Sequence, residues 1–335
     1  MTLRATSPKL VVTSQFAPFF SSLSVKDCWD AMGPVVTANL HTTIEQCTKP
    51  GTREHRKALY RHDNPHGNLF TLSFGLSEAE RFPYVVRLIE FLCIIDDVLE
   101  DLPHGEALVE HDILCNALRN EAVPTTKFTA NTRPEWIKFL RDIKVEMLAV
   151  DPIRSPCLLL ALEETLRTRE SSDVEFDTIE QYLPYRLINF DYEFVAQLIL
   201  WAMDIDLSPE EADSTLLRKF KYSIGVIAGL ANDYFSWERE KRQLTDSATD
   251  RIRNGVAVLM KEHNHLSDQD AKAAVKDLIV REEEKIRAVL DGNSSSQVAL
   301  SYPMSRYLEG LEMFAGGYSF WCATCPRYHK PQGDE

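Results

Sequence analysis

The chain has 335 residues, of which 44% are hydrophobic, and carries a formal net charge of −14. Its length allows one or two domains with a large buried core. The acidic balance argues against a nucleic-acid-binding protein, which usually has a basic face. It does not exclude an anionic small substrate, because a bound metal ion reverses the local field.

The seven cysteines are odd in number and mostly follow apolar neighbours, as is typical of reduced, buried thiols. Cys322 and Cys325 form a lone CxxC without a second pair, which disfavours a zinc site. Residues 1–13 have no apolar core of signal-peptide length, and no run reaches roughly 18 apolar residues. We therefore expect a cytoplasmic protein without stable membrane insertion.

Residues 77–99 predict a strong helix. Ser77 is its expected N-cap, with Glu80 as capping-box partner, and apolar residues continue at helical spacing to Ile95. Pro103 follows soon after, so the acidic segment 96–101 falls at the C-terminal end of this helix. Carboxylates at that end oppose the helix dipole, and a bound cation would offset the cost.

Helical patterns fill most of the remaining chain, and we predict one all-α domain spanning residues 1–335, with about ten helices and no linker. A kink or restart is expected at Pro184, and the tail from Pro326 should be frayed, with residues 329–335 disordered. The further predicted helices cover residues 106–120, 135–149, 156–170, 178–203, 209–241, 246–264, 268–290 and 298–322.

The upstream acidic cluster contains Asp96 and Glu100, which share a helix face, and the adjacent Asp97. By itself this pattern is weak, because acidic helix ends are commonly solvated. However, the apolar run 91–95 leads directly into the pair, which indicates a half-buried site where an unpaired charge is costly.

A second polar cluster follows the apolar run 224–231. Asn232, Ser236 and Glu240 recur every four residues, so their oxygens line one helix face, as Mg²⁺ ligands would. Asp233 points about 100° away and is left out of this set. The alternative is a charged helix end whose polar groups bond the neighbouring backbone. Two such clusters on separate helices could hold a diphosphate between them.

These motifs resemble those of class I terpene cyclases. The segment NDYFSWERE is similar to the family's ND(L/I/V/Y)xSxxxE metal motif, and DDVLE to its aspartate-rich motif. Arg186, 46 residues before Asn232, stands where the family has a diphosphate-sensing arginine, and Arg327–Tyr328 resembles its closing Arg-Tyr pair. Over about residues 15–330 the chain looks most like the cyclase domain of fungal chimeric terpene synthases, such as fusicoccadiene and ophiobolin F synthases.

The resemblance implies a helical bundle with a central cavity, in which several Mg²⁺ ions bridge the diphosphate of a polyprenyl substrate. Such an enzyme would ionise geranylgeranyl or geranylfarnesyl diphosphate, cyclise the cation to a polycyclic di- or sesterterpene and release diphosphate. The implied metal ligands are Asp96, Asp97, Glu100, Asn232, Ser236 and Glu240. The implied diphosphate donors are Arg186, Lys241, Arg327 and Tyr328.

Aromatic side chains are expected to line the apolar end of the cavity, because a carbocation is attracted to a ring face. Ordinary core packing is the alternative for each ring, and Trp321 is the strongest candidate because it precedes the Arg-Tyr pair. The candidates are Phe70, Phe74, Phe91, Phe190 and Trp321.

The chain departs from the family pattern at Asn189, where related cyclases often carry Asp; Asp191 lies two residues further on. It also stops at Glu335, just past the Arg-Tyr pair, so it is either an isolated cyclase domain or a piece of a longer protein that carries the prenyltransferase domain of the chimeric enzymes. Two alternative functions stay open. A chain-elongating prenyltransferase would need a second aspartate-rich motif in place of NDYFSWERE, and an inactive helical binding protein is compatible with the same residues. A class II cyclase is disfavoured, because there is no DxDD run.

Overall fold

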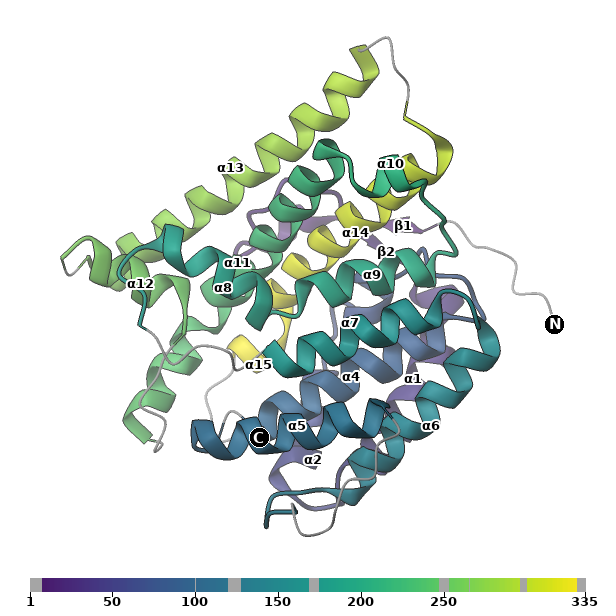
Figure 1. Cartoon of the computed structure of the whole chain (residues 1–335). Helices are drawn as coiled ribbons and strands as arrows, with labels where there is room; N and C mark the ends of the chain where they lie inside the picture. The colour runs from purple at the N-terminus through teal and green to yellow at the C-terminus, as the bar shows by residue number, and fades with distance from the viewer. Residues whose placement is uncertain are drawn as a thin grey trace.

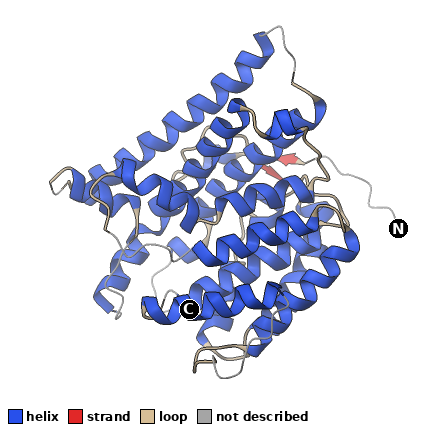
Figure 2. Cartoon of the chain, viewed as in Figure 1, coloured by secondary structure: helices blue, strands red, loops and turns tan. Residues whose placement is uncertain are grey.

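The computed structural model describes residues 8–99, 101–119, 128–168, 175–246, 253–264, 266–295 and 300–329. Most of this structure is helical, and the strands form one short antiparallel pair, β1 (Lys9–Leu10) and β2 (Lys26–Asp27) (Figure 2). This agrees with the predicted all-α class. The predicted ligand Glu100 lies outside the described residues.

Helices α11 (Thr215–Asp246) and α14 (Tyr302–Thr324) pack against each other, and α14 runs through the middle of the view in Figure 1. Helix α11 packs against α13, α14, α12 and α8, whereas α4 packs against α1 and α2. In chain order the helices are α1 (Trp29–Cys47), α2 (Arg53–Arg61), α3 (Leu69–Ser73), α4 (Phe82–Leu99), α5 (His104–Arg119), α6 (Pro134–Val150), α7 (Ser155–Thr168), α8 (Ile179–Asn189), α9 (Tyr192–Ala202), α10 (Pro209–Ala212), α11 (Thr215–Asp246), α12 (Gly255–Glu262), α13 (Asp268–Ser295), α14 (Tyr302–Thr324) and α15 (Pro326–His329).

The predicted start of the helix at 77–99 is wrong. Helix α4 begins at Phe82, and the Ser77 hydroxyl donates to the Phe74 carbonyl oxygen at 2.8 Å instead of capping the helix. The Glu78 N–H donates to the Ala202 carbonyl oxygen at 2.8 Å, which ties this segment to α9. Pro83 sits in the first turn of α4, where its missing N–H costs no helical hydrogen bond.

The helix predicted over 178–203 is divided, but not at Pro184. This proline lies inside α8, and the break falls after Phe190, where Asp191 has a φ of 57°. Asp is one of the few residues that enter this left-handed region readily. The break turns the chain so that α9 can pack against α14 while α8 stays against α11.

The C-terminal segment is more ordered than the sequence predicts. Pro326–His329 form α15, with Pro326 and Tyr328 buried, so the prediction of a frayed tail is wrong for these four residues. Residues 330–335 lie outside the described part. All seven cysteines are free. Among the described residues, no helix has the length and apolar character needed to cross a membrane.

Candidate active site

The polar face of α11 lies beside α8 because glycines allow the two helices to approach closely. A Cβ atom on Gly225 would lie 2.5 Å from Leu187 Cδ2, and one on Gly229 would lie 3.2 Å from Arg186 Cγ. Small residues in the apolar stretch before Asn232 therefore have a structural purpose. They bring the Arg186 side chain onto the surface of α11.

Arg186 is buried and binds both residues at the start of the predicted metal motif. Its Nη2 lies 2.7 Å from Asn232 Oδ1 and 2.9 Å from Asp233 Oδ1, and its Nη1 donates to Asn189 Oδ1 at 2.7 Å. Burial alone would lower the pKa of Arg186, but the Asp233 carboxylate raises it above its ordinary value, so the guanidinium stays charged. Asn189, the departure from the family pattern, is thus a direct partner of this arginine.

Asn232 joins Arg186 to the C-terminal helices. Its Nδ2 donates to the Tyr328 hydroxyl at 2.9 Å and to the Tyr318 hydroxyl at 3.2 Å. Because a guanidinium can only donate, the amide oxygen must face Arg186 and the NH₂ group must face the tyrosines. Tyr318 was not predicted from sequence; its position one helical turn before Trp321 is the only signal that could have suggested it.

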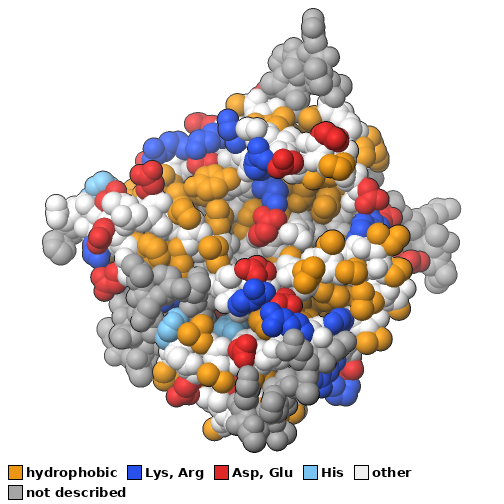
Figure 3. All heavy atoms as spheres, in the orientation of Figure 1, with side chains coloured by type: hydrophobic (Ala, Val, Ile, Leu, Met, Phe, Trp, Pro, Cys, Tyr) orange, Lys and Arg blue, Asp and Glu red, His pale blue; other side chains and the backbone are white. Residues whose placement is uncertain are grey.

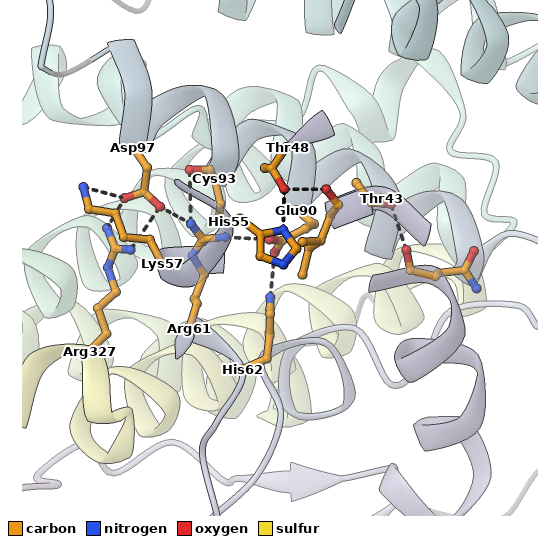
Figure 4. A network of polar contacts seen from close by, with 12 residues as sticks. Thr43, Thr48, His55, Lys57, Arg61, His62, Glu90, Cys93, Asp97 and Arg327 are labelled. Carbon is orange, nitrogen blue, oxygen red and sulfur yellow. Dashed lines mark hydrogen bonds and ion pairs between the residues drawn. The ribbon is translucent and has the colours of Figure 1, made fainter. Parts of the chain in front are cut away.

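The other end of the site centres on Asp97 of α4, where three cations from α2 and α15 converge (Figure 4). Arg327 Nη2 lies 2.9 Å from Asp97 Oδ1, Lys57 Nζ lies 3.9 Å from the same oxygen, and Arg61 donates to Oδ2. Burial would raise the pKa of Asp97, but the charges of Arg327 and Arg61 outweigh it and hold the pKa well below its ordinary value.

A second buried carboxylate extends this network. Glu90, fully buried in α4, accepts from Arg61 Nη1 at 2.7 Å and lies 2.6 Å from His62 Nε2. Lys57, Arg61 and Glu90 were not predicted from the sequence as site residues. Glu90 could have been found, because a carboxylate inside an apolar helical run needs a buried partner. The partner itself, more than twenty residues away, carried no local signal.

Four of the predicted motifs are therefore joined by direct contacts or by adjacency in the chain. Arg186 binds Asn232, Asn232 binds Tyr328, and Arg327, the residue before Tyr328, binds Asp97. Helices α11, α14 and α15 lie side by side around this set (Figure 1). Asp96 is half-buried beside Asp97 on α4.

Lys241 lies elsewhere in the structure. Its ammonium group pairs with Asp268 at the start of α13 and sits 6.0 Å from the centre of the Trp237 ring. Half of the Lys241 side chain is exposed. Because successive residues of a helix point about 100° apart, Lys241 lies on the outer surface of α11 although it follows Glu240 in sequence.

The C-terminal part of the polar face of α11, which carries Ser236 and Glu240, contacts the start of α12. Ser236 is buried and Glu240 half-buried, and both meet the side-chain amide of Asn254, with Nδ2 3.4 Å from Ser236 Oγ and 2.9 Å from Glu240 Oε2. Two of the predicted ligand oxygens therefore converge on one donor. In the described part of the chain, no three His, Cys, Asp or Glu side chains gather as a metal site. The amide, hydroxyl and carboxylate oxygens of α11 nevertheless form the hard donor set that suits Mg²⁺.

Asp233, omitted from the predicted ligands, is a structural junction. It is buried, it pairs with Arg186, and its Oδ2 lies 2.8 Å from the Tyr182 hydroxyl and 2.9 Å from the Gly255 N–H. Burial raises its pKa to about 6, against the opposing effect of Arg186. Asp233 thus connects α8, α11 and α12, which agrees with its predicted direction away from the ligand face.

The aromatic candidates fall into two groups. Phe190 and Trp321 both contact the Tyr318 ring, with centroid distances of 5.2 Å and 5.9 Å, and so border the Asn232 cluster. Phe74 and Phe70 extend this group away from Tyr318 by way of Phe314. The ring centroids of Phe74 and Phe314 are 5.5 Å apart, and those of Phe70 and Phe74 are 6.4 Å apart.

Phe91 belongs to a different part of the core. Its ring stacks on Phe139 of α6 at 4.6 Å and meets Trp136 edge-on at 6.2 Å. The side chain is fully buried between α4 and α6. These contacts are those of ordinary aromatic packing, the alternative considered from sequence.

Two surface grooves lie apart from this site. One, of about 780 Å³, runs between α7, α8, α9 and α11, and the other, of about 570 Å³, lies between α11 and α13. On the face drawn in Figure 3, hydrophobic side chains lie between acidic and basic ones over the elements that line the larger groove. Neither groove includes a predicted site residue.

Comparison with known proteins finds a matching family model and related sequences. Residues 87–285 match a family model described as terpene synthase family 2, C-terminal metal binding. Bifunctional terpene synthase FUP1 of Fusarium proliferatum is 30% identical over 83% of this chain and 37% of its own length. Sesterterpene synthase btcA of Colletotrichum orbiculare is 28% identical over 81% of this chain and 38% of its own length. The chain thus spans little more than a third of these relatives.

Solved structures agree with the fold. The crystal structure of aristolochene synthase from Penicillium roqueforti superimposes with a TM-score of 0.68 at 19% identity, covering 86% of this chain and 94% of that one. At this level of identity the likeness concerns the fold alone. It places the chain in the all-α architecture that the motifs led us to expect.

Proposed function

The chain belongs to terpene synthase family 2, C-terminal metal binding, and from this premise we propose that it is a Mg²⁺-dependent terpene cyclase acting on a long polyprenyl diphosphate. The observation that carries the proposal is the connected set Arg186, Asn232, Tyr328, Arg327 and Asp97. These residues come from α8, α11, α15 and α4, so only folding brings them to one place.

The reaction would begin with binding of the substrate diphosphate by this polar set. Arg186 presents a planar fork of donors that matches two phosphate oxygens, and Arg327 and Tyr328 add donors from α15. Asn232, Ser236 and Glu240, with Asp96 of α4, would hold Mg²⁺, which supplies positive charge to the leaving diphosphate. Donors fixed before the reaction stabilise the departing charge without having to reorganise.

After the allylic C–O bond breaks, the side chains around Tyr318 would guide the cation. Tyr318 contacts Asn232, and the rings of Phe190 and Trp321 contact Tyr318, so these three aromatic side chains would offer π faces to a positive charge. Excluding water from this region prevents premature capture of the cation. Ring closure followed by proton loss or water capture would give a polycyclic hydrocarbon or alcohol and free diphosphate.

For the substrate we propose geranylgeranyl or geranylfarnesyl diphosphate. This proposal is supported by the printed name of the Colletotrichum relative, a sesterterpene synthase. The name of the Fusarium relative, a bifunctional terpene synthase, further supports a prenyltransferase domain as the source of that substrate, as part of the same longer protein or as a partner.

The test is incubation of the purified chain with geranyl, farnesyl, geranylgeranyl and geranylfarnesyl diphosphates and Mg²⁺, each with and without isopentenyl diphosphate, followed by GC–MS of a hexane extract. We expect a cyclic product from one of the two longer substrates, and none from Asn232→Ala at unchanged circular dichroism. Consumption of isopentenyl diphosphate without any hydrocarbon or alcohol product would favour chain elongation. Full product formation by Asn232→Ala would overturn the metal assignment.

A further inference from the structure

Asn254, which immediately precedes α12, is completely buried and makes contacts that its sequence position does not suggest. Its Oδ1 accepts from the Val256 N–H at 2.8 Å, as an N-cap side chain does. This leaves the NH₂ group of the amide free of any role in its own helix. Within the described part of the chain, the contacts of that NH₂ group are all with α11.

The NH₂ group reaches three oxygens of α11. Nδ2 lies 2.9 Å from the Asp233 carbonyl oxygen, 2.9 Å from Glu240 Oε2 and 3.4 Å from Ser236 Oγ. An amide NH₂ has two hydrogens, so the two short contacts are its principal bonds and Ser236 shares one of them. Two of the three oxygens belong to the side chains proposed to hold Mg²⁺.

The start of α12 is fixed to α11 by a second, adjacent contact. The Gly255 N–H donates to Asp233 Oδ2 at 2.9 Å, and a Cβ atom on Gly255 would lie only 3.1 Å from that oxygen. Asp233 holds Arg186 with its other carboxylate oxygen, Oδ1. The dipeptide Asn254–Gly255 is therefore held against α11, which limits how far the Asn254 amide can move.

We propose that Asn254 is a positioning residue that orients Ser236 and Glu240 for metal binding. The inference rests on the proposed function. A glutamate has several rotatable bonds, and fixing it in one conformation before the ion arrives removes that entropic cost from binding. The bond from Asn254 to Glu240 Oε2 holds the carboxylate in one orientation and occupies only one of its two oxygens. Losing a partner that orients a metal ligand typically weakens metal binding about 10–100-fold.

The experiment compares Asn254→Ser with a matched control, Asn68→Ser. Serine keeps an N-cap acceptor in both variants but lacks the amide NH₂. Asn68 is a buried N-cap of α3 whose Oδ1 accepts from the Phe70 N–H at 2.9 Å, and this side chain contacts no predicted metal ligand among the described residues. Binding of Mn²⁺ in the presence of inorganic diphosphate is measured by electron paramagnetic resonance, so the readout does not depend on turnover.

We expect the Mn²⁺ concentration at half-saturation to rise about tenfold or more in Asn254→Ser and to stay within about twofold of wild type in Asn68→Ser. Unchanged Mn²⁺ binding in a folded Asn254→Ser variant would overturn the inference and leave the proposed function standing. Failure of the wild-type protein to bind Mn²⁺ with diphosphate would instead overturn the proposed function. If Asn254→Ser does not fold, Asn254→Thr gives the same comparison, and if neither variant folds, Asn254 is a stability residue and the inference falls.

Discussion

The buried carboxylate of Asp97 allows the sharpest prediction, because its structural surroundings and its predicted role as a metal ligand lead to different outcomes. Asp97→Asn keeps the shape of the side chain but removes a charge that faces Arg327 at 2.9 Å and Lys57 at 3.9 Å, with Arg61 also in contact. At an effective dielectric constant of about 20, charges at these distances attract by about 6 and about 4 kcal/mol before desolvation is subtracted.

The desolvation of these groups offsets most of that attraction in the folded protein, so the net effect must be judged from the charges left behind. Removing one partner from a buried ionic network typically costs about 3–5 kcal/mol. Arg61 keeps Glu90 as a partner, but Arg327 and Lys57 lose the carboxylate that they share in this network. At about 2 °C per kcal/mol for a chain of this size, we expect the Tm of Asp97→Asn to fall by about 6–10 °C.

The pH dependence provides a second check on the same group. The pKa of Asp97 is lower in the folded protein than in the unfolded chain, so its stabilising effect is complete above the unfolded pKa of about 4 and is lost as the pH falls through the folded value. The Tm difference between wild type and Asp97→Asn should therefore be constant from pH 8 to 5 and shrink below about pH 4. Thermal unfolding followed by circular dichroism measures both. An Asp97→Asn variant with the wild-type Tm but weakened Mn²⁺ binding would refute the inference that Asp97 stabilises the fold through its ion pairs, and it would favour a role as metal ligand.

Three further predictions test other parts of the structure. Gly225→Ala places a Cβ atom 2.5 Å from Leu187 Cδ2, so we expect a loss of about 1–3 kcal/mol in the free energy of unfolding; an unchanged denaturation midpoint would contradict the close α8–α11 approach. Trp321→Leu removes a ring beside Tyr318, so GC–MS should show altered product ratios with any substrate the wild type accepts; an unchanged ratio would count against Trp321 as a cavity residue. Lys241→Gln affects an exposed pair with Asp268, so the Tm and the KM for the diphosphate substrate should stay near wild type; a KM rise of about tenfold would show that Lys241 contacts the diphosphate.

The predicted fold class holds because hydrophobic periodicity is a local property of the chain. The pattern that predicted a helix over 178–203 could not locate its break, because Asp191 adopts its left-handed conformation where α8 and α9 follow different packing directions. Similarly, Ser77 matched the sequence signature of a capping box, but in the structure its hydroxyl bonds Phe74 and the neighbouring Glu78 N–H bonds α9, so no cap forms there.

By itself, the sequence determined the helical class, because hydrophobic periodicity is a local property of the chain, and its resemblance to class I terpene cyclases singled out Arg186, Asn232 and the Arg327–Tyr328 pair. Only the tertiary structure decided the partners: Asp97 with three cations, Asn232 with Tyr318, and Asn254 with Glu240. Each of these contacts joins different helices, so no local pattern encodes it. The physical reason is burial, since a charge or amide removed from water must find a partner among whichever side chains the packing of distant helices brings within reach.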